Sequence, residues 1–245
     1  MTALFVTGIG TEIGKTFLSA ALLHAWRRQG LCPGVAKPVL SGFDASAWQG
    51  CDTAILLRAA GQRVSLDAVR QATPLLFKAA LAPDMAAARE GQRLTRDAVL
   101  AACRVALASP ARPFLLEGAG GVMSPIAEDA TVLDIMAALG LPALLVGGSY
   151  LGAISHALTA LGMLRAHGVP VLALALSESE ASIGLAETMA AIARFAPEVA
   201  IFAVPRLASP AAAGADPSTQ ALARLISAPG PGAASRSPGN DPSPL

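Results

Sequence analysis

The sequence has few of the residues that mark several common classes of protein. Among its 245 residues are 3 cysteines, 4% aromatic residues and 14% charged residues. Cys32, Cys51 and Cys103 are spaced too irregularly for a disulfide framework or for the paired cysteines of a zinc or redox motif. We therefore expect scattered reduced thiols, which are typical of a cytoplasmic protein.

Net charge and long apolar runs are also lacking. The 18 basic and 17 acidic side chains leave a formal net charge of +1, which provides no basic excess for nucleic acid or anionic lipid. The richest apolar stretch, residues 135–148, contains Gly140-Leu141-Pro142 and is shorter than the ~20 residues of a membrane span. No basic segment precedes the first apolar run, so no signal peptide is predicted. We predict a cytoplasmic protein without nucleic-acid or membrane partners.

Ala, Leu and Val are abundant, and they form short apolar runs that alternate with segments of helical spacing. This alternation favours an α/β fold with a doubly wound, mostly parallel sheet and helices on both faces. The strands are predicted at residues 3–6, 34–39, 113–116, 142–146 and 171–176. A helix is predicted over 14–29, and another begins after Thr131, which is expected to form a capping box with Asp134.

The composition changes near the C-terminus. Residues 228–245 are rich in Pro, Gly and Ser without apolar periodicity, so this tail is predicted to be disordered. Residues 1–227 are predicted to form a single domain. Within it, the small residues 208–216 are interpreted as a linker and residues 218–226 as a last short helix.

The strongest chemical signal is GIGTEIGKT at residues 8–16, between a predicted strand and a predicted helix. Successive backbone N–H groups and a helix N-terminus can supply the many donors that phosphate oxygens need. Gly8 and Gly14 would let the backbone turn, Lys15 would approach the outer phosphates, and Thr16 would bind magnesium. The spacing, G-x5-G-K-T, is one residue longer than the standard motif. A chance glycine-rich turn is the alternative, but the motif and its context together favour nucleotide binding.

Three further charged residues are candidates for the same site. Magnesium usually takes one or two carboxylates in addition to phosphate and water. Glu117 ends an apolar strand and is followed by Gly118-Ala119-Gly120-Gly121. Asp52 follows Gly50-Cys51, where an ordinary helix N-cap is the alternative. Lys37 lies inside the strand-like run GVAKPV. A cation at the C-terminal end of a strand in an open parallel sheet faces the crevice where ligands bind; a surface lysine is the alternative.

Several motifs, taken in order, resemble the dethiobiotin synthetase family. They are GTEIGKT at 10–16, KPVLSG at 37–42, Asp52, FKAALAP at 77–83, EGAGG at 117–121 and LGAISHAL from Leu151, within a likeness that extends over residues 1–207. The resemblance implies a P-loop NTPase-like fold and a homodimer. It also implies ATP- and Mg2+-dependent ring closure of 7,8-diaminopelargonic acid with CO2 to dethiobiotin, through a carbamate and a carbamic phosphate.

The resemblance also assigns roles to residues of this chain. Lys15, Lys37 and the backbone around Thr11 would hold the carbamate and the γ-phosphate, and Ser41 would contact the substrate together with Lys37. Thr16, Asp52 and Glu117 would bind magnesium. The other implied nucleotide contacts are Glu12, Ile13, Gly14, Phe17, Gly118, Ala119 and Gly120, with Ser177, Pro205, Arg206 and Leu207 beside the adenine. The loop from Gly147 to Gly152 would reach the substrate carboxylate in the partner subunit, giving a composite active site.

Three positions depart from the family pattern. Gly10 replaces an aspartate common in the phosphate loop, which removes a carboxylate that could orient an amine. Ser177 replaces an asparagine that is common at the adenine. A hydroxyl offers fewer hydrogen-bonding groups for recognising a base than an amide does. Ala82-Pro83-Asp84 replaces a Thr/Ser-Pro-His stretch, and no role is assigned to it.

Two other classes share such a loop. An amide-forming synthetase of the cobyrinic-acid type usually carries a glutaminase domain, and the residues after Leu207 are too few for one. A partition or membrane-targeting ATPase usually has an early lysine in the loop, which Gly8 to Ile13 lack. The sequence therefore favours the synthetase.

Overall fold

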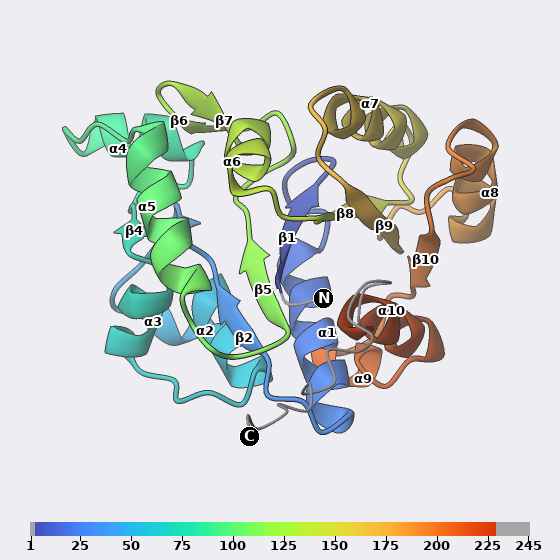
Figure 1. The fold of residues 1–245 in the computed structure, drawn as a ribbon, viewed down its shortest axis with the longest axis horizontal. Helices are drawn as coiled ribbons and strands as arrows, with labels where there is room; N and C mark the ends of the chain where they lie inside the picture. The colour runs from blue at the N-terminus through green and yellow to red at the C-terminus, as the bar shows by residue number, and fades with distance from the viewer. Residues whose placement is uncertain (1–2, 229–245) are drawn as a thin grey trace, which may run out of the picture.

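The computed structural model describes residues 3–228, and a six-stranded sheet forms its centre (Figure 1). The strand order is β10-β9-β8-β1-β5-β2, and all five pairings are parallel. The strands are β1 (Ala3–Gly8), β2 (Gly34–Ala36), β5 (Phe114–Glu117), β8 (Ala143–Gly148), β9 (Val171–Ser177) and β10 (Ile201–Val204). The predicted α/β class is confirmed. Apart from Ala228, the predicted C-terminal tail lies outside the described residues.

Strand β1 lies inside the sheet, between β5 and β8. Phe5 pairs with Leu116 on one side and with Ala143 on the other. Strands with buried residues on both faces are nearly continuous apolar runs, which explains why β1, β5 and β8 could be recognised in the sequence. The sheet therefore places the glycine-rich loop of residues 8–16, which begins at the end of β1, in the middle of the molecule.

Helices cover both faces of the sheet (Figure 1). Leu4 and Val6 share a core with helices α1, α2 and α10, whereas Phe5 packs into a second core with α5, α6, α7 and α8. This alternation follows from the two-residue period of a strand. These helices are α1 (Lys15–Arg28), α2 (Asp52–Ala59), α5 (Arg96–Leu107), α6 (Val132–Leu139), α7 (Ala153–Ala166), α8 (Leu185–Phe195) and α10 (Pro217–Ser227).

Shorter elements complete the described chain. They are β3 (Val39–Leu40), β4 (Leu75–Leu76), β6 (Pro125–Ala127), β7 (Ala130–Thr131), α3 (Leu66–Ala72), α4 (Pro83–Arg89), α9 (Pro210–Ala213) and a 3-10 helix over Trp48–Gly50. The predicted capping box is confirmed at α6, since Asp134 accepts from the backbone N–H of Thr131 at 2.7 Å and Thr131 accepts from that of Asp134. No helix among residues 3–228 has both the length and the apolar character needed to cross a membrane.

The structure corrects two predicted segments. Residues 34–39 do not form one strand, because the chain leaves β2 after Ala36 and Val39 pairs with Leu75 of β4 instead. Pro38 has no N–H to continue a ladder, which is consistent with this break. Residues 208–216 are not a linker, since they contain α9, capped by Ser209. At Gly214 an added Cβ would lie 2.7 Å from the carbonyl oxygen of Ala21, so this segment packs tightly on α1.

Candidate active site

The loop between β1 and α1 has the tight turn predicted for phosphate binding. A Cβ at Gly8 would lie 2.5 Å from Cδ1 of Ile13, so the loop closes over this position because Gly8 has no side chain. Glu12 (φ 57°) and Gly14 (φ 90°) have left-handed backbone conformations. The chain turns at these two residues and enters α1 at Lys15, which places the loop at the N-terminus of that helix.

Lys15 is buried against its own loop. Its Nζ donates a hydrogen bond to the carbonyl oxygen of Gly10 at 2.9 Å, and only 7% of the residue is exposed. Loss of hydration lowers the pKa of Lys15 from 10.5 to about 8, although the carboxylate of Glu117 acts in the opposite direction. The ammonium is thus a poorly hydrated donor that an anion in the loop would stabilise.

The glycine-rich segment after β5 packs directly on the phosphate loop. The N–H of Val122 donates to the carbonyl of Gly8 at 2.9 Å. A Cβ at Gly121 would lie 3.1 Å from both the backbone nitrogen of Gly10 and the carbonyl oxygen of Gly8. The absence of a side chain at Gly121 therefore allows the two backbones to approach closely, which is the physical reason for glycine in this segment.

Lys37, Asp52, Glu117 and Thr16 form one cluster, in which Lys37 and Glu117 are buried. The ammonium of Lys37 is paired with the carboxylates of Asp52 and Glu117, and its Nζ lies 3.0 Å from Oε1 of Glu117. The hydroxyl of Thr16 donates to the same oxygen at 2.8 Å. Glu117 is fully buried and Lys37 is 5% exposed. Four chain segments, the ends of β2 and β5 and the starts of α1 and α2, thus bring these groups together.

Two alternatives left open by the sequence are thereby excluded. Lys37 is not a surface lysine. Desolvation acts to lower its pKa, but the charges of Glu117 and Asp52 and their hydrogen bonds outweigh this effect and raise the pKa above its usual value. Asp52 is not the cap of α2, because Cys51 occupies that position and Asp52 begins the helix with its carboxylate on Lys37.

The donor set of this cluster fits magnesium bound together with a phosphate. Thr16, Asp52 and Glu117 offer hydroxyl and carboxylate oxygens, which Mg2+ prefers. Oε2 of Glu117 is buried and has no hydrogen-bond partner, so this oxygen is available to a ligand. Among residues 3–228, no three His, Cys, Asp or Glu side chains gather into a metal site of their own. Phosphate and water oxygens would therefore have to complete the coordination.

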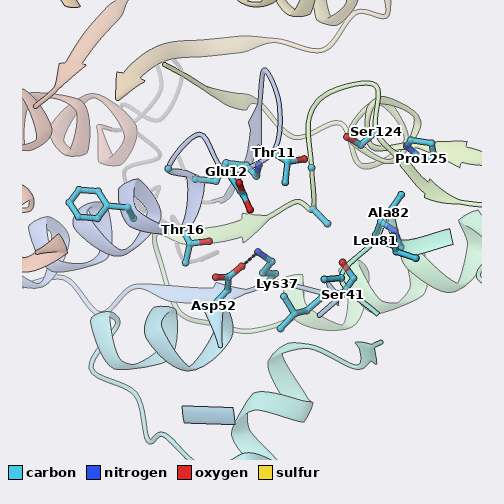
Figure 2. Close-up of a pocket in the computed structure, with 18 residues that line it drawn as sticks. Thr11, Glu12, Thr16, Lys37, Ser41, Asp52, Leu81, Ala82, Ser124 and Pro125 are labelled. Atoms are coloured by element: carbon cyan, nitrogen blue, oxygen red, sulfur yellow. Dashed lines mark hydrogen bonds and ion pairs between the residues drawn. The ribbon is translucent and has the colours of Figure 1, made fainter. Parts of the chain in front are cut away.

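A cavity of about 690 Å³ lies beside the cluster. The predicted site residues that line it are Thr11, Glu12, Gly14, Lys15, Thr16, Phe17, Lys37, Ser41, Asp52, Ala119 and Gly120. The remaining lining residues were not predicted and are Leu40, Ala80, Leu81, Ala82, Pro83, Ser124 and Pro125. Figure 2 shows Thr16, Lys37 and Asp52 at one end and Leu81, Ala82 and Pro125 at the other. The cavity therefore has a charged end and a largely apolar far wall.

A second cavity, of about 560 Å³, lies on the other side of the phosphate loop and shares Thr11, Glu12, Gly14 and Phe17 with the first. Its other predicted residues are Ile13, Ser177, Arg206 and Leu207. Tyr150 also lines it and belongs to the loop that was expected to reach the partner subunit instead, whereas Glu178, Ser179 and Glu180 were not predicted. Nothing in the local sequence marks these three, because their place in the wall depends on the pairing of β8 with β9.

Five predicted residues lie outside the lining of these two cavities. Glu117 and Gly118 line a small space behind the first cavity, and Pro205 directly precedes the Arg206 of the second. Gly147 is buried within β8, paired with Leu176, and so does not belong to the loop as expected. Gly152, at the start of α7, is exposed and has a φ of 100°.

Comparisons with known proteins identify relatives of the chain. Residues 2–212 match a family model described as an AAA domain. The chain is 48% identical over 91% of its length to the ATP-dependent dethiobiotin synthetase BioD of Phenylobacterium zucineum, and covers 96% of that protein. It is 45% identical over 84% of its length to the protein of the same name from Caulobacter vibrioides, covering 93% of it.

Among solved structures, the MinC:MinD cell division protein complex of Aquifex aeolicus contains a chain with the same fold. The TM-score is 0.53, and the alignment covers 92% of this chain and 94% of that chain. With 12% sequence identity this likeness concerns the fold alone. The identities to the synthetases extend over most of the chain and distinguish it from the two other classes that share such a loop. The chain therefore belongs to the dethiobiotin synthetase family and is an enzyme.

Proposed function

We propose that the chain catalyses the ATP-dependent formation of dethiobiotin from 7,8-diaminopelargonic acid and CO2, with release of ADP and phosphate. Its relatives are named for this ATP-dependent synthesis. The observation that carries the proposal is the cluster of Lys37, Glu117 and Thr16 beside the phosphate loop, because Lys37 and Thr16 also line a cavity with a largely apolar wall. The reaction brings together a charged phosphate and an aliphatic diamine, so it needs both the charged end and the apolar wall of the cavity.

The reaction consists of three steps. One substrate amine attacks CO2, loses a proton and becomes a carbamate. A carbamate oxygen then attacks the γ-phosphorus, and the bond to ADP breaks. The second amine finally attacks the carbonyl carbon, loses a proton and displaces phosphate, which closes the ureido ring.

The chain's own groups would position these reactants and neutralise their charge, which is the main demand of phosphoryl transfer. Lys37 would hold the carbamate, while Lys15 and the backbone around Thr11 would hold the γ-phosphate. Thr16, Asp52 and Glu117 would hold Mg2+, which when bound supplies positive charge to the outer phosphates. Ser41 lines the same cavity as Lys37 and would contact the substrate near the carbamate.

The nucleotide would extend across the phosphate loop from the first cavity to the second. Gly14 and Phe17 line both cavities, so they lie where the sugar and phosphates would pass. The base would then lie beside Ser177, Arg206 and Leu207 in the second cavity, with Pro205 next to them. The backbone from Gly118 to Gly120 follows Glu117 and would border the phosphates.

The substrate carboxylate would need a hydrogen-bond donor from a second subunit, which supports a homodimer. Lys15 and Lys37 are the only cations among the described residues that line the first cavity, and both lie at its phosphate end. A carboxylate at the other end of the substrate would need a donor from elsewhere. The exposed start of α7, with Gly152 next to Leu151 that is 85% exposed, would supply backbone N–H groups to the partner subunit.

A product assay with matched variants tests the proposal. The purified chain is mixed with 7,8-diaminopelargonic acid, bicarbonate and Mg-ATP, and dethiobiotin is measured by mass spectrometry while each component is omitted in turn. Product is expected only in the complete mixture. Lys37→Ala should form product about 10²–10³-fold more slowly, whereas Lys78→Ala should not, because Lys78 is exposed and lies outside both cavities. Absence of product from the complete wild-type mixture would overturn the proposal.

A further inference from the structure

The wall of the second cavity includes a segment without regular structure. Ser177, Glu178, Ser179 and Glu180 line the cavity as the chain leaves β9, and α8 begins only at Leu185. Glu178 is held by β10, since its N–H donates to the carbonyl of Val204 at 2.9 Å. Residues 179–183 need another support, because an irregular segment would otherwise lose conformational freedom each time a ligand binds.

Ser149, the first residue after β8, provides this support. Its N–H donates to Oγ of Ser179 at 3.0 Å, and its own Oγ accepts the N–H of Ser179 at 3.0 Å. The hydroxyls of Ser149 and Ser182 are 2.8 Å apart, and the carbonyl of Ser149 accepts the N–H of Ile183 at 2.8 Å. Ser149 is fully buried, so its own groups in these four bonds are shielded from solvent.

Gly148, the residue before Ser149, allows the contact between Ser149 and Ser179 because it has no side chain. A Cβ at Gly148 would lie 2.7 Å from Oγ of Ser179 and 2.8 Å from Cδ1 of Tyr150. Any side chain at Gly148 would therefore separate Ser179 from the end of β8. Tyr150 follows Ser149 and lines the second cavity, so the pairing of Ser149 with Ser179 connects two parts of the same wall.

We propose that Ser149 is a positioning residue for the nucleotide. It holds residues 179–183 in place, so that the second cavity is already formed when the nucleoside part of ATP binds. This inference rests on the proposed function, because it assigns the second cavity to the nucleotide. The side chain of Ser149 does not touch the ligand itself and acts through Ser179 and the residues next to it.

The test compares Ser149→Ala with Ser19→Ala. Ser19 is an equally buried serine whose hydroxyl has no hydrogen-bond partner, so its removal breaks no such bond. In Ser149→Ala the KM for ATP should rise about tenfold, the effect of leaving a buried donor unpaired. The kcat and the KM for the diamine should stay within about twofold of wild type, as should all three constants of Ser19→Ala.

Amide hydrogen exchange of the nucleotide-free protein provides a readout independent of activity. The amide of Ser179 should exchange faster in Ser149→Ala and should be unchanged in Ser19→Ala. Ser182 is exposed, and Ser182→Ala removes one of the four bonds of Ser149 together with the bond from the N–H of Gly184, so it should show a smaller change in the same direction. Faster exchange without a rise in the ATP KM would overturn the proposal, as would unchanged exchange or an equal loss in every kinetic constant.

Calorimetric binding of ADP separates this inference from the proposed function. If the wild type made no dethiobiotin but bound ADP, the weaker ADP binding expected of Ser149→Ala would still support the role of Ser149. Equal ADP affinity of the wild type and Ser149→Ala would overturn that role whatever the reaction.

Discussion

The ammonium of Lys37 lies 3.0 Å from Oε1 of Glu117, and the same oxygen accepts the hydroxyl hydrogen of Thr16. Lys37 and Glu117 are 80 residues apart in the sequence and are brought together because β2 pairs with β5. One buried carboxylate thus links the proposed carbamate-binding lysine to the first turn of the helix that follows the phosphate loop.

Replacing Lys37 with alanine should affect both catalysis and stability. We expect kcat to fall about 10²–10³-fold, as for the loss of one preorganised charge-stabilising donor. The change also leaves the fully buried Glu117 without its cation, which should cost about 3–5 kcal/mol of unfolding free energy. Single-turnover kinetics and urea unfolding measure the two effects, with Lys78→Ala as the control. Near-normal turnover in Lys37→Ala would contradict the assigned role.

Glu117→Gln should raise the magnesium requirement. The amide has nearly the size of the carboxylate, but it lacks the negative charge that a divalent cation needs. We expect the Mg2+ concentration for half-maximal activity to rise about 10–100-fold, and a direct Mg2+ titration in the presence of ADP should show the same shift. Glu90→Gln is a suitable control, because Glu90 lines neither cavity. An unchanged titration would show that Glu117 is not a metal ligand.

The affinity for a non-hydrolysable ATP analogue should fall as the pH rises through the pKa of Lys15. Because this pKa is lowered to about 8, the side chain is charged below that pH and increasingly neutral above it. A neutral amine cannot pair with a phosphate, so the dissociation constant should rise by up to about tenfold per pH unit above the pKa. Calorimetry from about pH 7 to pH 9 measures this effect. Lys15→Arg, which stays charged, should lack the dependence, and equal slopes would contradict the prediction.

Gly121→Ala should weaken nucleotide binding by displacing the phosphate loop. The added Cβ would lie 3.1 Å from atoms of Gly8 and Gly10, and these are backbone atoms that cannot move alone. We expect about tenfold weaker ADP binding and a loss of about 1–3 kcal/mol in stability. Gly162→Ala is the matched control, because no atom lies within 4 Å of its added Cβ, and α7 should become more stable. Unchanged ADP affinity in Gly121→Ala would refute the prediction.

We also propose that residues 1–227 contain the whole catalytic domain. A chain ending at Ala228 should keep the wild-type kcat and melting temperature. A chain ending at Asp216 should not fold, since it lacks α10, where Leu222 and Ile226 are buried and the carbonyl of Ala223 accepts the indole N–H of Trp26 at 3.0 Å. Activity and thermal unfolding of both chains measure the difference. Lower activity in the chain ending at Ala228 would show that later residues contribute.

Features that depend on residues close together in the sequence were predictable. The phosphate loop and the capping box of Thr131 with Asp134 are local, because their residue types and spacing specify the backbone. The placement of Lys37 and Glu117 at one edge of the sheet followed from a general rule, since ligands bind at the carboxyl ends of parallel strands. The pairing of β2 with β5, which brings the two residues together, was not predicted.

Features that depend on tertiary contacts were not predictable in the same way. The segment now seen as α9 consists of small residues without a helical pattern, and its packing on α1 near Ala21 is not encoded locally. Gly147 and Gly148 were taken for a loop, yet they continue β8 because they pair with Leu176 and Ser177 of β9. Ser149 and Ser179 resemble ordinary loop serines until that pairing brings them together.

The hydrogen bond from Lys15 to the carbonyl of Gly10 means that the loop supplies its own temporary acceptor. On the proposed role of Lys15, an incoming phosphate would exchange one oxygen partner for another, and the gain in affinity would be the difference between an anionic and a neutral acceptor. Compounds with an uncharged group in place of the terminal phosphate would gain little from Lys15, so this exchange would discriminate against them without any steric barrier.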